Sequence, residues 1–196
     1  MSEVFDSLGQ TNAAEELALL HQIHSAGYIQ TSQTFRLLQS YLRSVVAADR
    51  VTWLAAYRGT LPKNSWQVSV MRGWKVVDLI LPEGSDRQPK EVIEEYRKLS
   101  TQKGIDPMTL LAIESAGQTR VHRHVDLAVQ QEWSGSWINE KLSSDGIAER
   151  MLGVYTLSDY AESYLIVDKT SDSSGFSDAD AQSLYKLLYK IPRLHY

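Results

Sequence analysis

The sequence predicts an α+β domain in which helices cover both faces of a central antiparallel sheet of five or six strands. Two observations near the end of the chain carry this prediction. Two apolar runs flank the polar stretch Asp159–Glu162, which is typical of a β-hairpin. Ser177 and Asp180 then form the capping box of a helix whose leucines recur at helical spacing up to Pro192. Because a hairpin and one helix cannot bury their apolar faces alone, they require more sheet upstream.

The composition is that of an ordinary globular protein. The chain has 196 residues, of which 43% are hydrophobic and 22% charged, and its net charge is −4. The absence of cysteine excludes disulfides, thiolate chemistry and cysteine-type zinc sites. The start of the chain is acidic rather than a signal peptide, and no apolar run approaches the ~18 residues of a membrane span. We therefore expect a cytoplasmic protein with no cofactor.

Two helices are predicted over residues 12–48, after a flexible lead-in over residues 1–10. Asn12 and Glu15 form a capping box for a helix that ends near Ala26, and a second helix extends from Thr31 to Ala48. Their apolar stripes are wider than one sheet face needs, so we predict that they pair two copies of the chain into a homodimer. The predicted interface residues are Leu17, Leu20, His24, Phe35, Leu38 and Leu42.

The sheet and its inserts are predicted over residues 50–169, followed by a C-terminal helix over residues 178–191. All of residues 11–196 are expected to form one domain. The predicted strands upstream of the closing hairpin are Val51–Arg58, Trp66–Met71, Trp74–Leu81 and Thr119–Leu127. The predicted helices between them and the hairpin are Pro89–Gln102, Pro107–Ala116 and Glu132–Leu142.

Histidines raise the question of a metal site. Arg120, His122 and His124 alternate along a predicted strand, and two histidines at this spacing can share one metal. No third ligand is evident beyond Asp126, so solvent-facing histidines explain the pattern better. His24 lies three residues after another histidine, but it also continues an apolar helix stripe, which favours an interface role. We predict no metal.

Catalytic patterns are also weak. Glu94 and Glu95 lie in a charged helix, where a solvated face explains them, and no gly-rich phosphate loop occurs. Ser134-Gly135-Ser136 lacks the strand-to-helix setting of a nucleophile elbow. We therefore predict that the chain is not an enzyme.

Four phrases carry a family resemblance: LLQSYLRSVVAADRVTWLAAYR, QTRVHRHVDL, MLGVYTLSDYAESYLIVDK and GFSDADAQSLYKLL. Over roughly Thr31 to Ile191, the chain resembles the GAF-like sensor region of bacterial LuxR-type helix-turn-helix regulators. The resemblance implies a GAF-like fold and a sensory role. A DNA-binding module usually follows in such proteins, whereas this chain stops at Tyr196. We therefore expect either a fragment of a longer regulator or a free-standing sensor, with no direct nucleic-acid binding by this chain.

The resemblance also implies a place for a ligand, between one sheet face and the insert from about Pro82 to Gly146. Aromatic and polar side chains on both sides would suit a small molecule. The predicted ligand-binding residues are Trp53, Tyr57, Arg120, His122, Trp133, Trp137, Tyr155 and Tyr164. In this scheme Arg120 would bind a carboxylate in a bidentate way. The competing explanation makes the aromatic residues plain packing and leaves Arg120 on the surface.

Two functions remain open from the sequence. The first is a non-catalytic sensory module that binds a small ligand and signals through the dimer helices to a transcriptional output. The alternative is a structural dimerisation or protein-interaction module with no ligand. A large closed cavity beside the sheet would favour the first, and a completely filled core the second.

Overall fold

Five strands form one antiparallel sheet in the order β2-β1-β5-β4-β3. The computed structural model describes residues 31–59, 70–128, 131–170 and 175–191. Its strands are β1 (Arg50–Arg58), β2 (Trp74–Ile80), β3 (Arg120–Arg123), β4 (Ile147–Ser158) and β5 (Ala161–Thr170). The predicted α+β architecture with a central antiparallel sheet is confirmed.

The closing hairpin is the centre of this sheet. β4 and β5 pair over almost their whole lengths, with Gly153 opposite Leu165. On its other side β5 pairs with β1. The backbone N–H of Arg58, at the end of β1, donates to the carbonyl oxygen of Tyr160 at 2.7 Å and fastens the hairpin turn to that strand.

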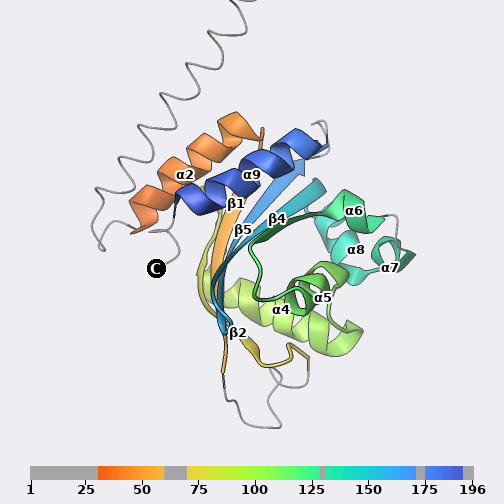
Figure 1. Cartoon of the computed structure of the whole chain (residues 1–196). Coiled ribbons are helices and arrows are strands. Elements are labelled where there is room, and N and C mark those ends of the chain that lie inside the picture. The colour runs from red at the N-terminus through yellow and green to blue at the C-terminus, as the bar shows by residue number, and fades with distance from the viewer. Residues whose placement is uncertain (1–30, 60–69, 129–130, 171–174, 192–196) are drawn as a thin grey trace, which may run out of the picture.

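Helices cover both faces of the sheet (Figure 1). On one face lie α2 (Thr31–Val45) and α9 (Asp178–Lys190). On the other lie α4 (Pro89–Lys103), α5 (Pro107–Glu114), α6 (His124–Ala128), α7 (Gln131–Ser134) and α8 (Trp137–Ser144). None of these helices is long and apolar enough to cross a membrane.

The C-terminal helix begins as its capping box predicts. The Ser177 hydroxyl accepts from the backbone N–H of Asp180 at 3.2 Å, and the Asp180 carboxylate accepts from the backbone N–H of Ser177 at 2.8 Å. The helix then packs closely on the sheet, because Gly153 has no side chain. A Cβ at that position would lie only 3.0 Å from the Leu184 side chain. This contact lies in the hydrophobic core between the sheet and helices α2 and α9, to which α2 contributes Phe35, Leu38 and Leu42.

Two predicted elements upstream of the closing hairpin, one strand and one helix, differ in the structure. The predicted strand Thr119–Leu127 ends at Arg123, where Arg123 forms an ion pair with Asp126 at 2.8 Å in the first turn of α6. The predicted helix Glu132–Leu142 is two helices, α7 and α8. The break falls at Ser136, whose hydroxyl caps α8 by accepting from a backbone N–H at 3.3 Å.

Two further predictions fall partly or wholly outside the described residues. Of the predicted strand Trp66–Met71, only its last two residues are described, and they belong to the turn before β2. The predicted helix from Asn12 to Ala26, with Leu17, Leu20 and His24, lies outside the described residues.

The remaining predicted interface residues lie inside the chain's own core. Phe35, Leu38 and Leu42 are at most 1% exposed and pack against the sheet. The apolar stripe of α2 is therefore covered within one chain. The homodimer stays a prediction.

Candidate ligand-binding site

A cavity of about 360 Å³ lies between the sheet and the helices of the α4/α5 side. Most of its lining is aliphatic. The sheet contributes Thr52, Leu54, Ala56, Val76, Leu152 and Ile166, among others. The helices contribute Val92, Ile93, Met108, Ala112, Ile113 and Ile138, among others.

Strand alternation explains why the sheet wall is apolar. On β1, Leu54 and Ala56 line the cavity, whereas Trp53 and Ala55 pack into the core on the opposite face. Both sets are apolar, as expected for a central strand covered on both sides. The cavity therefore lies within a second hydrophobic core, which includes Trp74, Met108 and Leu152.

Polar groups are concentrated where α5 begins. Asp106 is buried and caps α5 by accepting from the backbone N–H of Thr109 at 2.9 Å. The hydroxyl of Tyr96, on α4, donates to Asp106 at 2.5 Å and lies 2.9 Å from the Thr109 hydroxyl. Burial, followed by the neighbouring Asp106 carboxylate, raises the pKa of Tyr96 well above its ordinary value. Tyr96 therefore stays a neutral phenol, and all three side chains line the cavity.

A second polar cluster surrounds Glu162, which is fully buried. Its carboxylate accepts from the Arg120 guanidinium at 2.8 and 3.2 Å and from the Tyr164 hydroxyl at 2.6 Å. The backbone N–H of Gly117 also donates to it, at 2.9 Å. Burial and the Glu162 charge raise the pKa of Tyr164. Tyr164 lines the cavity, and this cluster fixes its phenol in place.

A third cluster is built on β4. Arg150 lines the cavity and donates from Nε and Nη2 to the buried Asp168 at 2.7 and 2.9 Å. The backbone N–H of Arg150 donates to His124 Nδ1 at 3.3 Å, and the imidazole stacks on the indole of Trp133 with 5.1 Å between ring centroids. The stacking places Trp133 against the cavity.

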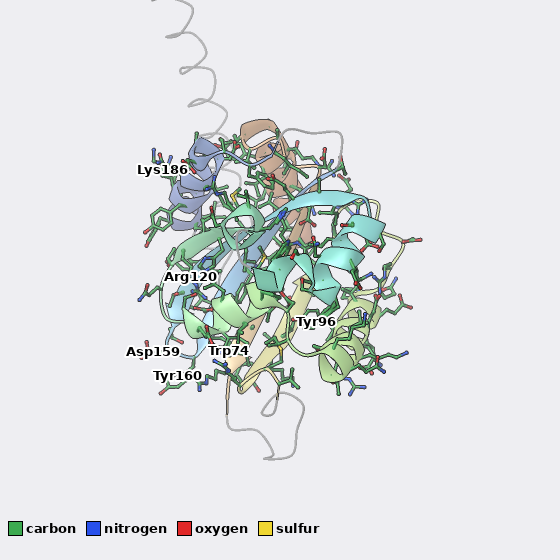
Figure 2. All side chains as sticks on the ribbon, turned by 90° about the vertical axis from the view of Figure 1, so that its right-hand side faces the viewer. Trp74, Tyr96, Arg120, Asp159, Tyr160 and Lys186 are labelled. Atoms are coloured by element: carbon green, nitrogen blue, oxygen red, sulfur yellow. The ribbon has the colours of Figure 1, made fainter. Side chains whose placement is uncertain are left out.

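The structure brings some of the predicted ligand-binding residues to this cavity. Trp133 and Tyr164 line it. Trp137 packs behind it, 5.4 Å from the ring of Tyr96, and its indole N–H donates to a backbone carbonyl oxygen at 2.8 Å. Figure 2 views the molecule from this side, with Trp74, Tyr96 and Arg120 labelled.

The other predicted residues do not line the cavity. The Arg120 guanidinium is engaged by Glu162 and by backbone carbonyl oxygens, and His122 lies 3.3 Å from the Ser115 hydroxyl. The remaining three lie elsewhere: Trp53 and Tyr155 pack into the α2/α9 core, and Tyr57 is exposed.

Sequence reasoning missed Trp74, Tyr96, Asp106 and Arg150 as lining residues. Asp106 stands directly before the predicted helix Pro107–Ala116, a position that carries no signal for a cavity. In the predicted helix Pro89–Gln102, Tyr96 falls at helical spacing with Val92 and Leu99, which indicates a buried face but not a cavity beside it. The spacing of Arg150 and Asp168 along two strands carries no signal until the strands are paired.

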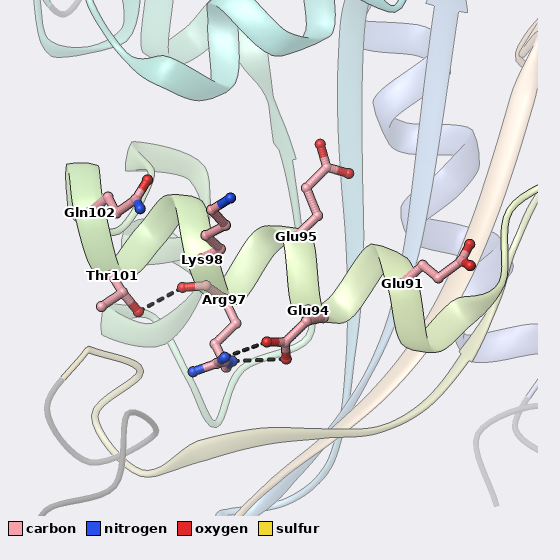
Figure 3. Close-up of a pocket in the computed structure, with 7 residues that line it drawn as sticks. All are labelled: Glu91, Glu94, Glu95, Arg97, Lys98, Thr101 and Gln102. Atoms are coloured by element: carbon pink, nitrogen blue, oxygen red, sulfur yellow. Dashed lines mark hydrogen bonds and ion pairs between the residues drawn. The ribbon is translucent and has the colours of Figure 1, made fainter.

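A depression of about 490 Å³ on the outer face of α4 is larger but open (Figure 3). Its side chains are charged or polar, and Arg97 forms an ion pair with Glu94 one turn away. Such exposed pairs are typical of a solvated helix face. Within the described ranges, no group of three histidine, aspartate or glutamate side chains could hold a metal ion.

Comparison with known proteins identifies the fold. No protein-family model and no curated protein matches the chain. Among solved structures, the chain is similar to the LBD domain of VqsR from Pseudomonas aeruginosa, with a TM-score of 0.55 and 14% identity over 96% of this chain and 94% of that one. It is also similar to SdiA of Escherichia coli, with a TM-score of 0.51 and 12% identity over 93% of this chain and 63% of that one.

The VqsR structure is that of its LBD, a ligand-binding domain. The chain therefore has the fold of these two structures, as its resemblance to LuxR-type sensor regions implies. At this level of identity the likeness concerns the fold.

Proposed function

We propose that this chain is the ligand-binding, non-catalytic sensory module of a transcriptional regulator. The cavity between the sheet and helices α4, α5 and α8 carries this proposal. Its volume of about 360 Å³ lies in the usual range of small-molecule sites, roughly 300–1,000 Å³. The shared fold of the VqsR and SdiA domains supports the regulatory role.

The lining indicates the kind of ligand. Aliphatic walls favour a molecule with an apolar body, because burying that body removes apolar surface from water. A few polar groups, among them Tyr96 and Asp106, would orient it. A metabolite that is small and mostly apolar, with limited polar functionality, is the expected occupant.

The proposed signalling from the ligand site to a transcriptional output requires the predicted homodimer. A cytoplasmic dimer paired through the N-terminal helices would pass ligand occupancy to a DNA-binding partner or module. Light scattering at about 10–50 µM, a concentration at which ordinary dimer affinities populate the dimer, tests the pairing. A monomer at these concentrations would contradict it.

A second candidate is a protein-interaction module without a ligand. One observation favours it: Tyr185 and Tyr189 of α9 are 41% and 53% exposed and lie edge to face. Exposed tyrosines are frequent at protein interfaces. In that case the cavity would have no physiological occupant.

Thermal stabilisation separates the two candidates. A broad metabolite screen should find compounds that raise the Tm of the wild-type chain. The variant Ala112→Phe, which fills the cavity from α5, should stay folded and lose that response. If no compound shifts the wild-type Tm, or if Ala112→Phe responds equally, the sensory proposal fails.

A further inference from the structure

The indole N–H groups of the four tryptophans that the structure describes are of two kinds. Trp53 lies in the α2/α9 core, and its Nε1 donates to the Ser163 hydroxyl at 2.7 Å. Trp137 lies behind the cavity, and its Nε1 donates to the Gly104 carbonyl oxygen at 2.8 Å. Neither side chain lines the cavity. Both buried donors are satisfied by the protein itself.

The two tryptophans that do line the cavity differ. Trp74 and Trp133 are each 2% exposed, and the Nε1 atom of each is buried without a hydrogen-bond partner. Native proteins pair nearly all of their buried polar groups, because an unpaired buried donor is destabilising. In the described part of the chain, unpartnered indole donors thus coincide with the cavity wall, which points to an acceptor supplied from outside the chain.

Trp133 has a second donor in its neighbourhood. Its ring stacks on His124, whose Nδ1 accepts from the backbone N–H of Arg150. The Arg150 side chain lines the cavity, and its Nε and Nη2 are taken by Asp168. Its Nη1 makes no hydrogen bond or ion pair with any residue that the structure describes. Trp133 and Arg150 therefore both line the cavity and both contact His124, and each has a side-chain N–H donor without a described partner.

The charge around Arg150 restricts the ligand. The Arg150 guanidinium is already balanced by the bidentate Asp168 carboxylate. Burial opposes the charged form of Arg150, but Asp168 and then Asp106 outweigh it and raise its pKa. A ligand carboxylate would therefore be repelled by the carboxylates of Asp168 and Asp106. A neutral oxygen would accept the two hydrogen bonds without this repulsion.

We propose that Trp133 and Arg150 form the polar subsite of the cavity and donate hydrogen bonds to a neutral acceptor oxygen, a carbonyl or hydroxyl, of the ligand. This inference rests on the proposed function, since it assumes that the cavity binds a small molecule. It names the two residues that determine which oxygen-bearing ligands the cavity accepts. Trp74, on β2, lies three strands away from β4 in the sheet and belongs to the far wall.

Three probes of similar size test the subsite: butylbenzene, butyrophenone and 4-phenylbutanoate. They share a phenyl ring and a four-carbon chain, and differ in having no oxygen, a ketone or a carboxylate. Their Kd values are measured by titration of the full chain, of Trp133→Phe and of Arg150→Lys. Both variants keep a similar shape. Lysine keeps the charge opposite Asp168, but its single nitrogen stays with that carboxylate, so the branch that would reach the ligand is removed. Trp137→Phe is the control, because the indole N–H that it removes already donates to the Gly104 carbonyl oxygen.

Trp133→Phe is expected to weaken butyrophenone about fivefold, the effect of one neutral hydrogen bond, and Arg150→Lys at least about tenfold, because the guanidinium donor is charged. Both variants should leave butylbenzene unchanged. The control should lower the Tm but keep the ratio of the two Kd values. 4-Phenylbutanoate should bind the wild type more weakly than the ketone.

Two outcomes overturn the subsite while the cavity still binds butylbenzene: an unchanged ketone-to-hydrocarbon ratio in both variants, or tighter binding of the carboxylate than of the ketone. If none of the three probes binds the wild type, the proposed function itself is overturned, and the subsite with it.

Discussion

The two faces of the sheet serve different purposes, although the same strands build both. On the α2/α9 face, Leu38, Leu165 and Leu188 are fully buried, and α9 approaches β4 so closely that only Gly153 fits beneath Leu184. On the α4/α5 face, equally apolar strand positions surround a cavity of about 360 Å³. A sheet covered on both sides can therefore gain stability from one filled face and keep the other for a ligand.

Polar groups follow the same division. Charged side chains in the α4/α5 layer are buried in hydrogen-bonded clusters, such as the one that joins Arg120 to Glu162. The α2/α9 side also buries polar groups, but they bond to the backbone: Gln39 Nε2 donates to the Val51 carbonyl oxygen at 2.8 Å, and Lys169 Nζ to that of Gly175 at 3.1 Å. Among the described residues, the buried ion pairs Arg120–Glu162 and Arg150–Asp168 therefore lie on the cavity side.

The largest expected effect comes from the Glu162 cluster. Glu162→Ala should destabilise the chain by about 3–5 kcal/mol, because it leaves the Arg120 guanidinium buried without its partner. Urea unfolding gives the difference. The matched control is Glu114→Ala, which removes an exposed ion pair with Arg72 and should cost no more than about 1 kcal/mol. Equal losses in the two variants would contradict the structural role of the buried cluster.

Truncation of one large side chain on each face sharpens the comparison. Leu184→Ala, in the filled core, should cost about 3–5 kcal/mol. Met108→Ala, at the cavity wall, should cost about half as much, because that side chain already borders empty space and loses fewer contacts. Both losses are read from urea unfolding. A larger loss for Met108→Ala would mean that the α4/α5 face is as tightly filled as the other.

Adjacent alanines on β1 allow the opposite experiment. Ala55 packs against the filled core, so Ala55→Leu should overpack it and cost about 1–3 kcal/mol. Ala56 lines the cavity, so Ala56→Leu has room and should change the free energy of unfolding by less than about 1 kcal/mol. Thermal unfolding of the two variants measures the contrast, and a reversed order would place the empty space on the wrong face.

The smallest expected effect is a pH dependence. Burial, helped by the nearby Arg120, lowers the pKa of His122, and burial also lowers that of His124, beside Arg150. Since the unfolded chain then binds protons more readily, stability should be complete above about pH 6.5 and fall as the pH drops below it.

The measurement is the Tm between pH 7.5 and pH 5.5. A loss of a few degrees is expected in the wild type, and a smaller one in the double variant His122→Asn, His124→Asn. Equal slopes in the two proteins would assign the pH dependence to other groups.

Sequence patterns predict the parts of this fold that local rules determine. The Ser177 capping box and the hairpin turn are properties of a few neighbouring residues, and both are present in the structure. The predicted strand is longer than β3, because the alternation of apolar residues continues past Arg123 in the sequence. The alternation does not indicate the ion pair between Arg123 and Asp126, which forms where α6 begins.

The site was predicted less completely, for a physical reason. Trp53 and Trp133 look alike in the sequence, but Trp53 on β1 faces the filled core, whereas Trp133 on α7 lines the cavity. Arg120 reads as a free cation, since its partner Glu162 lies 42 positions away along the chain. The cavity itself leaves no recognisable pattern in the amino-acid sequence.

The most direct test of the two-face account is a crystal structure under xenon pressure, because xenon enters dry apolar cavities that are large enough to hold it. The account predicts xenon density among Leu54, Met108 and Ile138, and none between the sheet and the α2/α9 layer. An α4/α5 face without xenon, or xenon in the α2/α9 core, would contradict it.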